Sequence, residues 1–154
     1  MNFLAKLIAT VFFLGYIPLA PGTIGTLVGI LVYLSIKNFN PLFYILFTLL
    51  FFIVSTWAAH QTERLLGETD PSQIIIDETA SFLVTMFLIP CSIKIICAGF
   101  LLNRFFDITK IYPANLADKK VKGGWGIMLD DLVAGIYSCL VLHLLIYLFP
   151  LLKT

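Results

Sequence analysis

Residues 123–135, GGWGIMLDDLVAG, form a glycine-rich stretch that leads through two adjacent carboxylates, Asp130 and Asp131, into an apolar segment. The run that follows, residues 132–152, contains no Asp, Glu, Lys or Arg. Because a membrane helix takes roughly 20 apolar residues, this run is long enough to cross a bilayer. The stretch therefore predicts a membrane helix with two carboxylates at its N-terminus.

Two neighbouring carboxylates are costly in such a place. An Asp at the bilayer centre costs about 3 kcal/mol on insertion scales, and the two charges also repel each other. A bound cation would remove that repulsion. The alternative is that the pair only caps the helix, which stabilises a helix by about 0.3–1 kcal/mol, but one Asp would be enough for that. Three glycines just upstream allow a backbone to approach a phosphate closely, which favours a functional site.

The composition indicates an integral membrane protein with a single membrane-embedded domain, residues 1–154. Of its 154 residues, 60% are hydrophobic and only 12% are charged, far on the apolar side of soluble proteins. The net charge of +1 argues against nucleic acid as a partner. The three cysteines lie in apolar runs, where we expect buried thiols and no disulfide.

Apolar runs along the chain predict an all-α fold. Residues 3–20 hold Lys6, Gly15 and Pro18, so an interfacial helix that stays in the mature chain fits better than a clean span or a cleaved signal peptide. Further apolar helices are expected at residues 24–36, 41–59, 79–89, 95–106 and 132–152, with a hydrophilic loop over residues 60–73. We therefore predict a compact multi-helix integral membrane bundle of about 4–5 membrane-embedded helices plus an N-terminal interfacial helix.

Charged residues gather where these apolar runs begin or end. Asp77 and Glu78 precede one apolar helix, as Asp130 and Asp131 precede another. Arg104, Asp107 and Lys110 are spaced i, i+3, i+6, so they lie close to one helix face. An ion-pair ladder at the membrane surface is the alternative reading of that spacing.

A turn-rich segment, residues 18–26, carries Thr23 and Thr26, which can cap the helix expected after it. Free amide groups at a helix start suit an anion, although an ordinary loop between helices is the simpler alternative. The segment has no Walker lysine, so a nucleotide-binding loop is not supported.

A basic loop with Lys119, Lys120 and Lys122 predicts the orientation, because positively charged loops stay in the cytoplasm. Counting spans from this loop puts every charged stretch described above on the cytoplasmic side. We therefore expect these stretches to converge on one site that faces the cytoplasm.

The expected site suits phosphate chemistry assisted by a metal ion. Carboxylates without a His or Cys at ligand spacing suit a hard cation such as Mg²⁺, whereas Arg, Lys and glycine-rich amides suit a phosphate. The predicted catalytic and metal-binding residues are Asp77, Glu78, Asp107, Asp130 and Asp131. The predicted phosphate-binding residues are Thr23, Thr26, Arg104, Lys110, Gly123 and Gly124. Cys97 lies one position too far from Arg104 for a Cys-x₅-Arg phosphate loop.

Four blocks resemble the signature motifs of the phosphatidylglycerophosphatase A family, in family order and across nearly the whole chain. They are PLAPGTIGT at residues 18–26, Asp77-Glu78, RFFDITKIYP at residues 104–113, and GGWGIMLDDLVAG at residues 123–135. Two departures are Ser81, where the family usually has glycine, and Tyr112, where tryptophan is common.

The resemblance implies a Mg²⁺-dependent phosphoric monoester hydrolase in the bacterial inner membrane, multi-pass, with its active site facing the cytoplasm. Its substrate would be the membrane phospholipid phosphatidylglycerophosphate, hydrolysed to phosphatidylglycerol in phospholipid biosynthesis. Two alternatives are a small ion transporter that uses its carboxylates and another membrane phosphotransferase. The transporter explains the acids but not the cations and glycine-rich stretches, and the phosphotransferase lacks its spaced Asp ladder.

Overall fold

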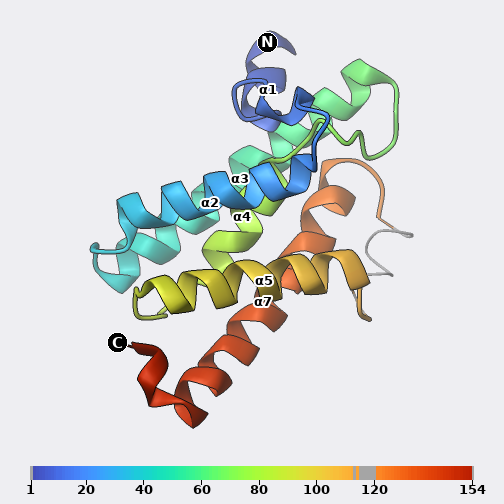
Figure 1. The fold of residues 1–154 in the computed structure, drawn as a ribbon. Coiled ribbons are helices and arrows are strands. Elements are labelled where there is room, and N and C mark those ends of the chain that lie inside the picture. The colour runs from blue at the N-terminus through green and yellow to red at the C-terminus, as the bar shows by residue number, and fades with distance from the viewer. Residues whose placement is uncertain (1, 113, 115–120, 154) are drawn as a thin grey trace.

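The chain folds into helices around one short, buried helix, α4. The computed structural model describes residues 2–112, 114 and 121–153, and within these ranges it contains helices and no strands (Figure 1). The elements are α1 (Asn2–Ala9), η1 (Leu14–Tyr16), α2 (Pro21–Ile36), α3 (Pro41–Leu66), α4 (Ile76–Thr85), α5 (Ile93–Thr109), α7 (Gly124–Leu148) and η2 (Pro150–Lys153). The all-α prediction is confirmed for this part of the chain.

Helix α4 is packed by α2, α3, α5 and α7, and nearly all of its residues are buried. Phe82 and Leu83 of α4 are fully buried in a core cluster with Tyr33 of α2 and Leu142 of α7. A second core cluster contains Ile75, just before α4. Because α4 begins with two acids, this central position places them inside the molecule.

Glycines let α2 approach α4 at backbone distance. A Cβ on Gly25 would lie 2.6 Å from the carbonyl oxygen of Ile75, and one on Gly29 would lie 3.0 Å from that of Thr79. The Thr79 hydroxyl donates to the carbonyl oxygen of Gly25 at 2.9 Å. Both glycines are therefore required by the contact between the two helices.

The beginning of α2 differs from the expected one. The helix starts at Pro21 instead of residue 24, with Ala20 as its N-cap in the left-handed region. Proline is favoured at the first helical position because its missing N–H would have no partner there. Thr23 and Thr26 therefore lie inside the helix and do not cap it.

Two other helices are longer than the apolar runs that predicted them. Helix α3 continues from the expected end at residue 59 to Leu66 and stops at Gly67, which has a left-handed φ of 70°. Helix α7 begins at Gly124, eight residues before its expected start. Asp130 and Asp131 therefore lie within α7, in its second turn, and not at its N-terminus.

Two helices, α3 and α7, are long and apolar enough to cross a membrane, and α2 is a shorter apolar helix. The expected 4–5 membrane-embedded helices exceed what the described structure supports. On α3, Leu42, Leu46 and Leu50 are each more than half exposed, which is unusual for a soluble protein and suits contact with lipid.

The cysteines are less buried than expected. Cys91 and Cys97 are exposed and Cys139 is partly buried, all three as free thiols. Cys91 is exposed because it lies in the turn before α5, and Cys97 is exposed because it lies on a face of α5 that does not face the core.

Candidate active site

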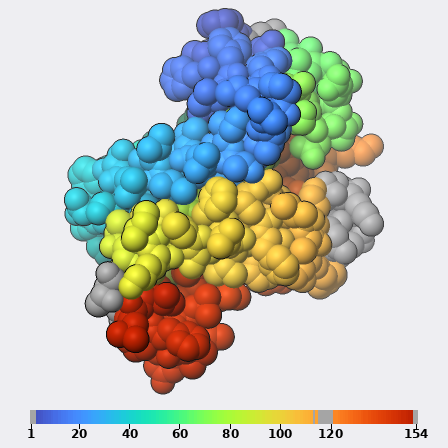
Figure 2. Space-filling model, viewed as in Figure 1, coloured from blue at the N-terminus to red at the C-terminus, as the bar shows by residue number. Residues whose placement is uncertain are grey.

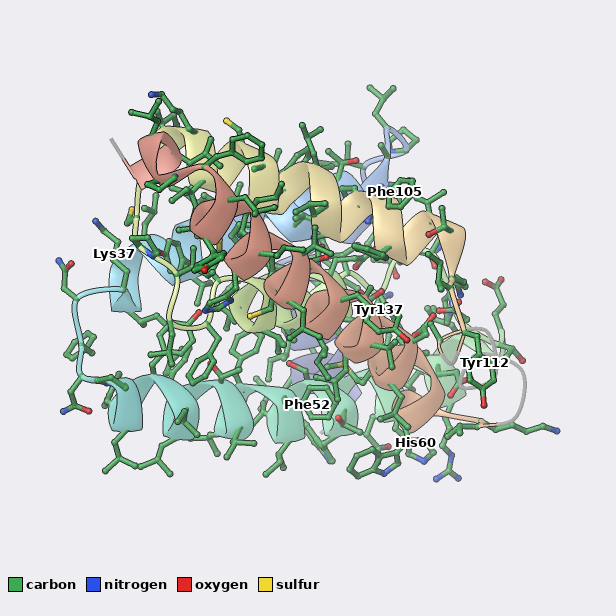
Figure 3. The ribbon with its side chains drawn as sticks, turned by 90° about the horizontal axis from the view of Figure 1, so that it is seen from below. Lys37, Phe52, His60, Phe105, Tyr112 and Tyr137 are labelled. Atoms are coloured by element: carbon green, nitrogen blue, oxygen red, sulfur yellow. The ribbon has the colours of Figure 1, made fainter. Side chains whose placement is uncertain are left out.

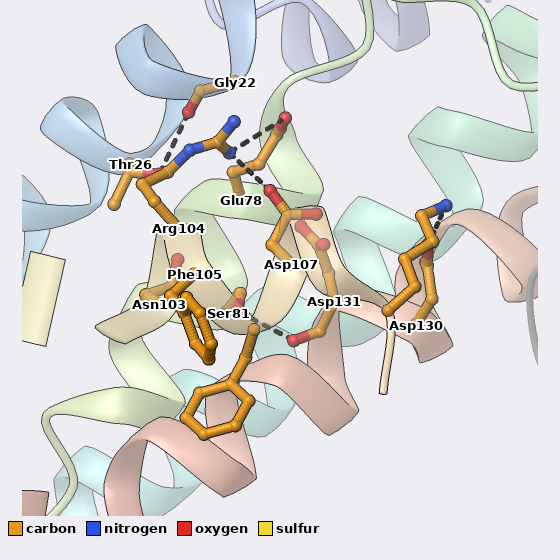
Figure 4. A network of polar contacts seen from close by, with 12 residues as sticks. Gly22, Thr26, Glu78, Ser81, Asn103, Arg104, Phe105, Asp107, Asp130 and Asp131 are labelled. Atoms are coloured by element: carbon orange, nitrogen blue, oxygen red, sulfur yellow. Dashed lines mark hydrogen bonds and ion pairs between the residues drawn. The ribbon is translucent and has the colours of Figure 1, made fainter. Parts of the chain in front are cut away.

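A cavity of about 200 Å³ opens among the beginnings of α2, α4 and α7, the end of α5 and the segment before α4. Its walls hold six acidic side chains and one lysine: Asp70, Asp77, Glu78, Asp107, Asp130, Asp131 and Lys110. Residues from four stretches far apart in the sequence therefore meet at one place (Figure 4).

The centre of the cluster is a set of three carboxylates, Asp77, Glu78 and Asp131. One oxygen from each lies within 4.8 Å of the other two, close enough for a single ion to contact all three. Asp77 and Asp131 are only 8% and 4% exposed. Asp77 and Glu78 come from the first turn of α4, where the helix dipole favours negative charge.

Four carboxylate oxygens in the cluster are buried without a hydrogen-bond partner in the described structure: Asp77 Oδ1, Glu78 Oε2, Asp130 Oδ1 and Asp131 Oδ2. A buried polar atom left unpaired costs about 1–3 kcal/mol, and more if it is charged. Unpaired oxygens on adjacent acids are the ligands that a hard divalent cation prefers. The donor set therefore fits Mg²⁺.

The electrostatics of the protein alone disfavour the charged cluster. Burial, together with the neighbouring charge of Glu78, raises the pKa of Asp77 well above its usual range. Burial likewise raises the pKa of Glu78. A nearby cation favours the charged form of a carboxyl group and so acts against both shifts.

Two cations lie beside the acids, each held by a different one. Arg104 donates from Nη1 to Asp107 Oδ2 at 2.5 Å, and the same nitrogen lies 3.9 Å from Glu78 Oε1. Lys110 is just beyond the end of α5, in the left-handed region, and its Nζ lies 2.8 Å from Asp130 Oδ2. Of the ion-pair ladder that the i, i+3, i+6 spacing allowed, the structure shows the pair between Arg104 and Asp107.

A buried polar network supports α7 behind the carboxylates. The Ser81 hydroxyl donates to the backbone carbonyl of Asp131 at 2.7 Å and accepts from Asn103 Nδ2 at 2.7 Å. Asn103 Nδ2 also lies 3.0 Å from Thr85 Oγ1. Ser81 thus joins α4, α5 and α7, and Gly135 lies opposite it, so close packing is kept where the sequence departs from glycine.

Arg104 does not itself line the cavity but contacts Asp107 and Glu78, which do. Four other residues predicted to bind phosphate lie away from the cavity lining: Thr23, Thr26, Gly123 and Gly124. The buried Thr26 hydroxyl donates to the carbonyl oxygen of Gly22 in its own helix. The Gly124 amide donates to His60 Nδ1 at 3.4 Å, which packs the start of α7 against α3. Their phosphate contacts stay predictions that this geometry does not favour.

Sequence reasoning missed Asp70, which lines the cavity and whose negative charge adds to the raised pKa of Asp77. It has a φ of 50° in the segment between α3 and α4. Its only signal is an acid before a proline in a hydrophilic loop, a pattern common in ordinary turns. Of the basic loop, Lys119 and Lys120 lie outside the described residues.

Comparisons with known proteins agree with these motifs. The family model for phosphatidylglycerophosphatase A matches residues 7–146. The chain is 36% identical to the phosphatidylglycerophosphatase A of Haemophilus influenzae over 143 residues, 92% of this chain and 88% of that protein. It is 32% identical to that of Escherichia coli K12 over 146 residues, 94% and 85% of the two chains.

A third relative carries a different name. The chain is 34% identical over 149 residues to a Bacteroides thetaiotaomicron protein named "Putative phosphatidylinositol-3-phosphatase", with 92% of each chain covered. No solved structure matches the chain.

Proposed function

The chain belongs to the phosphatidylglycerophosphatase A family, and on that premise we propose that it hydrolyses phosphatidylglycerophosphate to phosphatidylglycerol and phosphate in phospholipid synthesis. The main observation that supports an active site here is the group of buried, unpaired carboxylate oxygens next to two cations. A site with more acids than cations repels an anionic phosphate unless a metal ion offsets the excess negative charge.

Asp77, Glu78 and Asp131 would hold Mg²⁺, because their oxygens converge and three of them have no other partner in the described structure. When bound, Mg²⁺ would neutralise phosphate oxygens and make a nearby water more acidic. The five acids of the predicted set outnumber Arg104 and Lys110 by three charges, and one divalent ion would offset two of these three excess negative charges.

The two cations would bind the oxygens of the terminal phosphate. Asp107 fixes Arg104 and Asp130 fixes Lys110, so each acid keeps its partner oriented toward the cavity region. In hydrolysis a water oxygen bonds to phosphorus and the bond from phosphorus to the glycerol oxygen breaks. One water proton passes to a carboxylate of the cluster and from there to the glycerol oxygen, which leaves as a hydroxyl, so that the carboxylate is restored.

We place the protein in the bacterial inner membrane as a multi-pass enzyme whose site faces the cytoplasm. The apolar helices α3 and α7 support a membrane position. Trp57 and Trp125 lie with His60 and Lys122 around one surface pocket. This pocket is at the end of α3 and the beginning of α7, which we call the site end because the carboxylate cavity also lies there. Tryptophan and basic side chains together are typical of the membrane surface on the cytoplasmic side.

Phosphate release from phosphatidylglycerophosphate by the purified protein tests the reaction and the metal together. We expect activity with Mg²⁺, none with excess chelator, and a loss of about 100-fold or more in Asp131→Asn and Asp107→Asn. Asn keeps the shape of Asp but removes its charge, so an acid that only packs inside the fold should tolerate the change. Equal release by the wild type in excess chelator would contradict the metal site.

Glu68→Gln is the matched control, because Glu68 is an exposed acid just after α3 and does not line the cavity. Its activity should equal that of the wild type. Because one relative is named for another lipid phosphate, phosphatidylinositol 3-phosphate belongs in the same assay. A preference for it would replace the proposed substrate while keeping the same site.

A further inference from the structure

The cavity, about 200 Å³ in volume, has room for a phosphate group but little for the apolar part of a lipid, and apolar grooves lie on the surface outside it. One lies between α2 and α5, about 360 Å³ in volume. Its six lining residues are all apolar: Leu27, Ile30, Ile96, Cys97, Phe100 and Leu101. Figure 2 shows α2 and α5 side by side on the face that contains this groove.

One wall of the groove leads directly to Arg104. Cys97, Leu101 and Arg104 are spaced i, i+4, i+7, so they share one face of α5. At a rise of about 1.5 Å per residue, Cys97 lies about 10 Å along the helix from Arg104. The apolar stripe on α5 therefore ends at a cation of the candidate active site.

The beginning of α2, the helix that forms the other wall, lies against the same guanidinium. A Cβ placed on Gly22 of α2 would lie 3.0 Å from Arg104 Nη2, so the guanidinium lies against this glycine. Leu27 of the groove follows Gly22 by five residues, about 8 Å along α2 and about 140° around it, so the two residues lie close along the helix but on different faces. Figure 4 shows the Arg104 side chain reaching from α5 toward Gly22. The α5 wall thus runs from the apolar groove to this positive charge, and the beginning of α2 lies beside the same charge.

An apolar groove that ends at a cation fits an amphiphile with an anionic headgroup. We propose that an acyl chain of the phospholipid substrate lies in the α2–α5 groove, with the anionic headgroup on Arg104 at its end. The inference rests on the proposed lipid phosphatase function and adds where the substrate's tail binds. It also explains why Leu101 is 65% exposed on a face that leads into a polar site.

A second apolar groove, about 280 Å³ between α3, α4 and α7, fits this role less well. Its α7 wall contains Ile136, Cys139 and Leu140. One or two turns toward the site, the same face of α7 carries Leu132 and Val133 instead of Asp131. That groove therefore does not lead to a charged group of the cavity along α7.

The native cysteines allow the two grooves to be compared directly. Cys97 lines the α2–α5 groove and Cys139 lines the other one, whereas Cys91 is exposed in the turn before α5. We would prepare three variants that each keep one cysteine and attach a benzyl group to it with a methanethiosulfonate reagent. Each labelled protein is compared with its own unlabelled form, so the background substitutions cancel.

Two substrates separate tail binding from chemistry: long-chain phosphatidylglycerophosphate in mixed micelles and its deacylated, water-soluble headgroup. Labelled Cys97 should lose about tenfold or more in kcat/KM on the lipid, because the groove can no longer bury several methylenes of the chain. Its activity on the deacylated headgroup should be unchanged. Labels on Cys139 and Cys91 should leave hydrolysis of the lipid unchanged.

The rate of labelling gives a second readout that needs no catalysis. The long-chain lipid should slow the reaction of Cys97 with the reagent, and the deacylated headgroup should not. Unchanged lipid hydrolysis after Cys97 is labelled, an equal loss on both substrates, or a loss only after Cys139 is labelled would each overturn the proposal. If unlabelled protein releases no phosphate from either substrate, the proposed function fails, and protection of Cys97 by the lipid still decides the groove.

Discussion

At the scale of single residues, Ser81 is the side chain that connects the carboxylates to the rest of the molecule. It is 2% exposed, and its hydroxyl bonds to the Asp131 carbonyl and to Asn103. Without that hydroxyl, the carbonyl oxygen on α7 loses its partner on α4. The position of Asp131 therefore depends on a residue that does not itself line the cavity.

We predict that Ser81→Ala lowers the free energy of unfolding by about 1–3 kcal/mol, because it leaves a buried carbonyl and a buried amide group short of a partner. Phosphate release should fall several-fold as Asp131 loses its support. Unfolding in detergent and the phosphate assay measure the two effects.

Ser138→Ala is the matched control. The Ser138 hydroxyl is equally buried but donates to Ala134 in its own helix, so its loss unpairs nothing between helices. Ser138→Ala should lower the free energy of unfolding by about 1 kcal/mol or less. Equal destabilisation by both substitutions would contradict the supporting role of Ser81.

The sequence predicts the cluster acids because a charge in an apolar surrounding is costly and therefore conspicuous. The structure brings Asp77, Glu78 and Asp131 together as that reasoning expected. Asp70 could not be found in the same way, because a charge in a hydrophilic loop is solvated, carries no energetic penalty and so does not stand out in the sequence. Its place at the cavity depends on how the segment between α3 and α4 folds back over α4.

At the scale of helices, the glycines of α2 set the distance between α2 and the acids of α4. We predict that Gly25→Ala lowers the free energy of unfolding by about 1–3 kcal/mol, because the new Cβ meets backbone, which cannot rotate away. That Cβ would also lie 3.1 Å from Glu78 Oε2, so the apparent affinity for Mg²⁺ in the phosphate assay should weaken.

Gly99→Ala in α5 is the control for Gly25→Ala. A Cβ there would lie 3.1 Å from the sulfur of Met86, a flexible side chain that can move. Alanine also favours a helix over glycine by up to about 1 kcal/mol, so this variant should be as stable as the wild type. A similar loss of stability in both variants would show that the contact between α2 and α4 does not require glycine at position 25.

Apolar runs predict where helices exist but not where they end. The run that predicted a helix over residues 41–59 stops where polar residues begin, yet α3 continues to Leu66 with His60 and Arg64 exposed on its last turns and Thr62 buried. Similarly, Gly124 and Gly126 suggested a loop, although both lie within the first turn of α7. Tertiary contacts at His60 and Val121 require small residues there, and the sequence alone cannot show those contacts.

At the scale of the whole molecule, the unpaired carboxylate oxygens predict that Mg²⁺ stabilises the fold. A ligand at 100 times its dissociation constant adds about 2.7 kcal/mol to the free energy of unfolding, which raises the melting temperature by several degrees. The wild type in detergent should show this rise, and Asp131→Asn should not. Without Mg²⁺, the variant should melt no lower than the wild type, because one buried charge is gone. An equal rise in both proteins would place the stabilising ion elsewhere.

The arrangement of α3 and α7 predicts how the molecule lies in the membrane. From Asn40 to His60, α3 rises about 30 Å, which matches the hydrocarbon core of a bilayer. His60 meets the start of α7 at Gly124, so the site ends of the two helices lie together. Figure 3 shows Lys37 at the opposite end of the molecule from His60 and Tyr112.

Exposed positions at these two ends should therefore react from opposite sides of the membrane. In a cysteine-free background, Asn38→Cys should react with a membrane-impermeant maleimide in intact spheroplasts, and Lys122→Cys only in inside-out vesicles, because Lys122 lies at the site end beside Trp125. Labelling after denaturation confirms that each thiol is present. If both positions react in intact spheroplasts, at least one of the two long helices does not cross the bilayer. The carboxylate cavity could then not be reached from the cytoplasm in the way that the basic loop predicts.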